Sequence, residues 1–123
     1  MRAAIFREKG LLKVEDVPDP VVGARDVLLR VTHCAICGSD LHRYSFGMLR
    51  PGAIMGHEYS GIVVDKGAEV SEFKIGDRLV RSGGKSNPWK DVPWYPPRFS
   101  ARNRGLLPTE KPGAYAEYFL ADA

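Results

Sequence analysis

The stretch DVLLRVTHCAICGSDLH, residues 26–42, passes from an apolar segment into a polar motif. Its apolar part, Asp26–Thr32, has the near-continuous hydrophobic centre that is typical of a strand buried on both sides. Its polar part, Cys37–His42, stands where a rigid strand gives way to a turn. A reactive group at such a position is held firmly from behind while its tip stays accessible. The sequence therefore predicts a functional site directly after a central strand.

Short alternating segments on both sides of this stretch are predicted to be strands. They are Arg2–Phe6, Leu12–Val17, His57–Val64, the turn and strand of Phe73–Val80, and Ala114–Leu120. The first two should form a hairpin around Gly10. Ser39 as a cap, followed by Asp40 at the positive end of the helix dipole, predicts a short helix to about Tyr44. Such strands with one or two short helices indicate a mainly β fold, a small antiparallel barrel or sandwich.

Length and composition are those of one ordinary globular domain. The chain has 123 residues, of which 27% are charged and 44% hydrophobic, so neither disorder nor a fibrous repeat is indicated. No apolar run approaches a membrane span, and the start MRAAIF passes into a strand without a signal-peptide core, so we expect a cytoplasmic location without membrane binding. The net charge of +3 forms no basic stripe on a helix, which argues against nucleic-acid binding.

A long proline-rich, basic loop is predicted from Ser82 to about Pro112. Loops of this length without secondary structure tend to be functional or partly disordered. Its large apolar side chains are Trp89, Trp94, Tyr95 and Phe99. The loop is interpreted either as a solvated connection or as a segment whose aromatic groups pack against a neighbouring subunit or domain.

Cys37, His57 and Glu58 are the candidate metal ligands. A thiol, an imidazole and a carboxylate are ligand types that zinc takes, and three of them leave one coordination position open, as in a catalytic site. A closed structural site needs a second pair to complete Cys34 and Cys37, and none is present. A cysteine alone is more often simply buried, and this is the interpretation of Cys34.

Three polar residues beside Cys37 allow two interpretations each. Asp40 is either a charge at the start of a helix or the carboxylate that fixes the tautomer and orientation of a metal-bound histidine. Ser39 and His42 are either a cap and a surface histidine, or a pair that passes a proton between substrate and solvent. Spacing alone leaves these alternatives open.

Four segments occur in the order found in one known family: Ile36–His42, Gly56–Gly61, Phe73–Val80 and Gly113–Tyr118. Together they resemble the zinc-dependent alcohol dehydrogenases of the medium-chain dehydrogenase/reductase type, and in particular their GroES-like N-terminal catalytic domain. The resemblance runs the whole chain, so residues 1–123 are expected to form that domain.

The resemblance implies a role for each candidate residue. Cys37 and His57 would bind one catalytic zinc ion, and Glu58 would either bind it or lie beside it. Asp40 would support His57, while Ser39 and His42 would form the family's proton relay. The implied reaction is hydride transfer between an alcohol or carbonyl substrate and NAD or NADP, with zinc as Lewis acid. The full-length enzyme is expected to be a homo-oligomer.

The sequence departs from the family in two respects. The stretch after the Gly76-Asp77-Arg78 turn lacks the four clustered cysteines of the family, so no structural zinc is expected. No G-x-G-x-x-G fingerprint occurs either, so the Rossmann domain for NAD or NADP and the remaining zinc ligand are expected outside residues 1–123. The chain by itself is expected to be inactive. The alternative, from another functional class, is a GroES-like binding or interaction module without metal.

Overall fold

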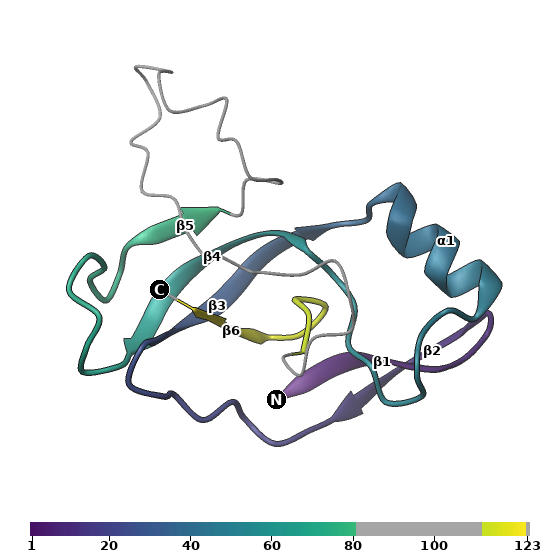
Figure 1. Ribbon diagram of the computed structural model, residues 1–123, viewed down its shortest axis with the longest axis horizontal. Coiled ribbons are helices and arrows are strands. Elements are labelled where there is room, and N and C mark those ends of the chain that lie inside the picture. The colour runs from purple at the N-terminus through teal and green to yellow at the C-terminus, as the bar shows by residue number, and fades with distance from the viewer. Residues whose placement is uncertain (81–111, 123) are drawn as a thin grey trace, which may run out of the picture.

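The computed structural model describes residues 1–80 and 112–122, which form two antiparallel sheets (Figure 1). β1 (Arg2–Glu8) and β2 (Leu11–Asp16) make the first sheet, a hairpin. The second sheet has the order β5-β4-β3-β6, with β3 (Asp26–Ala35), β4 (Glu58–Lys66), β5 (Arg78–Val80) and β6 (Tyr118–Asp122). Within the described residues the single helix is α1 (Gly38–Phe46). The predicted mainly β class and the first hairpin are confirmed.

The core lies on one face of the four-stranded sheet. The buried members of this core cluster are Val27, Leu29, Tyr59, Val63, Val70, Phe73, Leu79, Ala114, Phe119 and Ala121. Burial of a large apolar side chain contributes about 1.5–3 kcal/mol, so this cluster holds the sheet together. The rings of Tyr59 on β4 and Phe119 on β6 lie with centroids 4.3 Å apart, which ties these two strands together across β3.

The central strand β3 is buried on one face and not on both. Val27 and Leu29 are fully buried, whereas Leu28 is half-buried and Arg30 is exposed. The prediction that its apolar centre is covered on both sides is therefore wrong. Successive side chains point to opposite faces, and only one face of this sheet carries the core.

The two sheets are joined by isolated bridges. Ala3 pairs with Ala116, and Ile5 pairs with Ile54, so β1 lies against two segments that are far apart in sequence. The backbone N–H of Ala4 donates to the carbonyl of Tyr115 at 2.8 Å. These contacts bring the segment before His57 next to the segment before β6.

Several strand boundaries differ from those predicted, most clearly those of β3 and β6. β3 continues three residues past Thr32, because its pairing with β4 extends until Ala35 stands opposite Glu58. β6 begins at Tyr118 rather than at Ala114. Most of the predicted 82–112 loop lies outside the described residues. In the described part of the chain, no helix is both long and apolar enough to cross a membrane.

Candidate metal centre

Cys37 is positioned by the turn between β3 and α1. Its backbone is extended, with φ −83° and ψ 153°, and it is the N-cap of the helix. The predicted helix with Ser39 as its cap and an end near Tyr44 is therefore wrong at both ends. The Asp40 carboxylate accepts a hydrogen bond from the N–H of Cys37, which starts the helix two residues earlier. The helix ends at Phe46, before a left-handed glycine.

Glu58 is the first residue of β4 and His57 directly precedes it, following a glycine that the local packing requires. Gly56 has φ +95°, a conformation that strains residues with a side chain. A Cβ atom there would also lie 2.8 Å from Cδ1 of Tyr115 and 2.9 Å from Sγ of Cys34. The chain therefore approaches His57 through a position at which a side chain does not fit.

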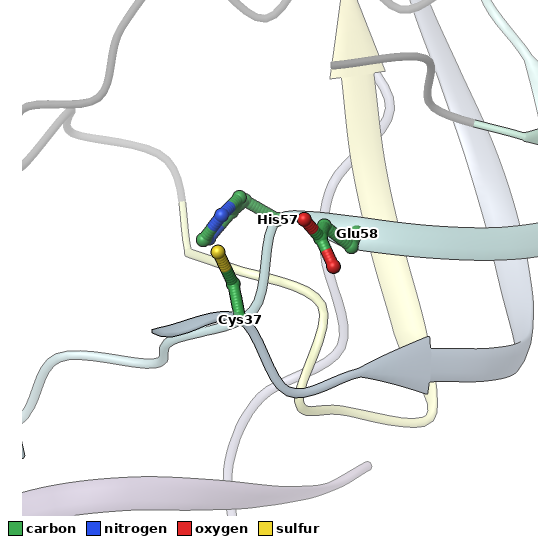
Figure 2. A group of neighbouring side chains, drawn as sticks. All are labelled: Cys37, His57 and Glu58. Carbon is green, nitrogen blue, oxygen red and sulfur yellow. The ribbon is translucent and has the colours of Figure 1, made fainter. Parts of the chain in front are cut away.

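The structure brings Cys37, His57 and Glu58 together. One ligand atom from each residue lies within 4.8 Å of the others, and Figure 2 shows the Cys37 thiol pointing toward the His57 ring. Cys37 and His57 are half-buried, and Glu58 is exposed. A thiolate, an imidazole and a carboxylate converging from two chain segments form a donor set that suits zinc.

Asp40 supports this cluster from behind and is only 2% exposed. Its Oδ2 accepts hydrogen bonds from the Cys37 N–H at 3.1 Å and from the Tyr115 hydroxyl at 3.0 Å. Its Oδ1 lies 3.4 Å from Nδ1 of His57 and accepts no hydrogen bond that meets the usual geometry within the described part of the chain. A buried carboxylate oxygen needs a partner. A hydrogen on Nδ1 would supply it and place the lone pair of His57 on Nε2, the nitrogen that a metal would bind, so these residues fit a zinc ion.

The two residues of the predicted relay occupy different surroundings. Ser39 is half-buried, and its Oγ lies 3.4 Å from Nε2 of His57. His42 is exposed, and its ring lies against that of Phe46, with centroids 4.5 Å apart. Residues three apart on a helix are neighbours on its surface. Ser39 thus lies next to the ligand cluster, and His42 lies one helical turn further along α1, exposed to solvent.

Tyr115 is a site residue that sequence reasoning missed. Its hydroxyl donates to Asp40, and burial, followed by this hydrogen bond, raises the pKa of the phenol well above its ordinary value. The sequence places Tyr115 in a segment predicted as strand, 75 positions from Asp40. No local pattern connects two residues at such a separation.

Cys34 is not part of the ligand cluster. It is half-buried and packs against the core cluster, which confirms its predicted core role. Burial, as the main cause, raises the pKa of its thiol from an ordinary value of 9.0 to about 11. The thiolate is the reactive form of cysteine, so the folded chain should protect Cys34.

Alkylation of Cys34 tests this pKa. In the Cys37→Ser variant, Cys34 is the remaining thiol of the 123 residues. Its rate of alkylation by iodoacetamide at pH 8 should be about a hundredfold lower in the folded chain than in the urea-unfolded chain, because the higher pKa lowers the fraction of thiolate. Between pH 9 and 11 the Cys34 thiol is deprotonated in the unfolded chain and still protonated in the folded chain. The contribution of Cys34 to the free energy of unfolding is therefore intact below pH 9 and falls as the pH rises. Equal rates in the two states would contradict the assignment.

Comparison with known proteins defines the class to which this fold and donor set belong. Residues 23–123 match the family described as the alcohol dehydrogenase GroES-like domain. The chain belongs to this family of oxidoreductase domains.

Individual relatives agree with this family. The L-threonine 3-dehydrogenase of Anaeromyxobacter dehalogenans (strain 2CP-C) is 35% identical over 122 residues, covering 95% of this chain and 35% of the relative. The crystal structure of 2R,3R-butanediol dehydrogenase from Bacillus subtilis superposes with a TM-score of 0.72 at 27% identity, covering 98% of this chain and 38% of that one. The crystal structure of a putative zinc-binding dehydrogenase from Sinorhizobium meliloti 1021, bound to NADP, superposes with a TM-score of 0.70 at 26% identity, covering 98% of this chain and 36% of that one. The chain thus spans little more than a third of the length of these relatives.

Proposed function

We propose that residues 1–123 are the zinc-binding catalytic domain of a dehydrogenase that interconverts an alcohol and a carbonyl compound with NAD or NADP. The observation that carries this proposal is the cluster of Cys37, His57 and Glu58, backed by the buried Asp40, in a chain of the alcohol dehydrogenase GroES-like family. We further propose that the cofactor domain and a remaining zinc ligand lie outside this chain, because it spans only 35% of the first relative.

One catalytic zinc ion would be held by Sγ of Cys37 and Nε2 of His57, with Glu58 either binding it or lying beside it. Within the described residues this is the single group of three candidate ligands, and it is the group that supports one catalytic ion. When bound, the zinc would polarise the substrate oxygen as a Lewis acid.

The residues around the ligands would orient them and move a proton. Asp40 would hold His57 with Nδ1 turned toward it, so that Nε2 faces the metal. The Ser39 hydroxyl, beside Nε2, would exchange a proton with the substrate, and the exposed His42 would pass that proton to solvent. This division of roles follows the difference in burial between Ser39 and His42.

The substrate class that the relatives support is a small secondary alcohol. Of the relatives compared above, two are named for L-threonine and for 2R,3R-butanediol, and both compounds carry a secondary hydroxyl. We propose such an alcohol or the matching ketone as substrate, and a homo-oligomer as the form of the full-length enzyme.

A metal-dependent activity assay tests this function. The full-length protein that carries this chain should reduce NAD or NADP with at least one member of a panel of L-threonine, 2R,3R-butanediol, ethanol and sorbitol. A chelator should abolish turnover, and added zinc should restore it. The 123-residue chain alone should be inactive with either cofactor. Turnover that persists after complete removal of zinc would contradict the proposal, as would inactivity together with an absence of stoichiometric zinc.

A further inference from the structure

We propose that Tyr115 is a positioning residue of the zinc centre, acting through Asp40 on the orientation of His57. The inference rests on the proposed zinc site and extends it to a residue 75 positions from Asp40 in sequence. It is carried by the contacts of the Tyr115 hydroxyl, ring and backbone.

The first step concerns the Asp40 carboxylate. Rotation of an aspartate carboxylate about its last bond is broad and roughly two-fold, so one hydrogen bond from the Cys37 N–H would fix it only loosely. The Tyr115 hydroxyl donates to the same oxygen, Oδ2, at 3.0 Å. Oδ2 thus accepts hydrogen bonds from two different chain segments, and together they fix the orientation of the carboxylate plane. The other oxygen, Oδ1, is thereby directed to Nδ1 of His57, 3.4 Å away.

The second step concerns how Tyr115 is itself held. Its backbone N–H donates to the carbonyl of Met55 at 2.9 Å, and its own carbonyl accepts from the N–H of Ala4 at 2.8 Å. Its ring lies so close to Gly56 that a Cβ there would meet Cδ1 at 2.8 Å. Tyr115 therefore contacts the residue before His57 as well as the carboxylate that faces His57.

The third step is the choice of hydrogen-bond acceptor. The Tyr115 hydroxyl has one hydrogen to donate, and it lies 3.3 Å from the carbonyl of Ala35 as well as 3.0 Å from Asp40. A hydrogen bond to an ionised carboxylate is shorter and stronger than one to a neutral carbonyl. The hydroxyl is thus directed to Asp40, and a phenylalanine at this position would keep the ring packing and lose only this bond.

Zinc affinity in a double-mutant cycle tests the proposal. The dissociation constant of zinc would be measured in the full chain by competition with a chromophoric chelator, for wild type, Tyr115→Phe, Asp40→Ala and the double variant. Loss of a group that orients a metal ligand costs about 10–100-fold in metal affinity, so Tyr115→Phe should weaken zinc binding about tenfold. The same substitution should have no further effect in the Asp40→Ala background, because Tyr115 acts through that carboxylate.

A matched control and a spectroscopic readout complete the experiment. Tyr44→Phe removes a hydroxyl that donates to the carbonyl of Gly10, away from the ligand cluster, and should leave zinc affinity unchanged. The absorption spectrum of the cobalt-loaded Tyr115→Phe variant should differ from that of wild type, because the spectrum reports ligand geometry. This readout needs only the single variant if Asp40→Ala does not fold.

Three results would overturn the proposal. The first is a zinc affinity and cobalt spectrum of Tyr115→Phe that match wild type. The second is an equal loss of affinity in the presence and absence of Asp40, which would show a general structural role. The third is a wild-type chain that binds no zinc, which would contradict the proposed metal site as well and is thereby distinguished from the first two.

Discussion

Replacement of Cys37 by serine, or of His57 by alanine, should abolish stoichiometric zinc binding. Each substitution removes one of the two donors that are half-buried and backed by Asp40. Loss of a supporting residue alone costs about 10–100-fold in affinity, so loss of a ligand itself should cost more than about a hundredfold. Isothermal titration of the metal-free chain with zinc would measure this loss, and turnover by the full-length protein should disappear with it.

Cys34→Ser is the matched control for this prediction. It removes the same kind of sulfur atom from a position that packs against the core cluster and lies outside the ligand group. Zinc binding should be retained in this variant. If Cys34→Ser abolishes binding while Cys37→Ser does not, the wrong thiol has been assigned.

Replacement of Phe119 by alanine should lower the free energy of unfolding by about 3–5 kcal/mol. Phe119 is 2% exposed, and its ring contacts that of Tyr59 across the core. The substitution leaves a cavity, which the surrounding strands cannot readily close because hydrogen bonds to their neighbours hold them in place. Since domains of this size are stable by only about 5–15 kcal/mol, the loss is a large part of the total. Urea unfolding followed by circular dichroism would measure it.

Phe46→Ala provides the comparison for this second prediction. Phe46 is 64% exposed at the last position of α1, so the same change of side chain should alter the free energy of unfolding by only about 0.5 kcal/mol. Similar losses in the two variants would mean that the core is not where the structure places it.

The candidate ligands could be found in the sequence because they are close together there. Cys37 and Asp40 occupy one helical turn, and His57 and Glu58 are adjacent, so residue type and spacing were sufficient to propose them. Tyr115 could not be found in this way. Its contact with Asp40 depends on how the 112–117 segment returns to the beginning of β4, which is decided by tertiary structure.

The errors of the sequence-based fold have a similar origin. The helix starts at Gly38 because the Asp40 carboxylate accepts from the Cys37 N–H, and Ser39 is as plausible a cap by residue type. The half-burial of Leu28 and exposure of Arg30 depend on what covers the second face of the sheet. Local hydrophobicity predicts that a strand exists but not how completely each face is covered.

X-ray absorption at the zinc edge of the zinc-loaded chain tests the central claim most directly. Coordination by Cys37 and His57 predicts one sulfur at about 2.3 Å, together with nitrogen and oxygen at about 2.0–2.2 Å, and the scattering pattern of an imidazole ring. The same sulfur should be present in zinc-loaded Cys34→Ser, whereas Cys37→Ser should retain no stoichiometric zinc that could give this shell. A shell with two sulfur atoms, or a shell of oxygen alone, would contradict the assignment of this site.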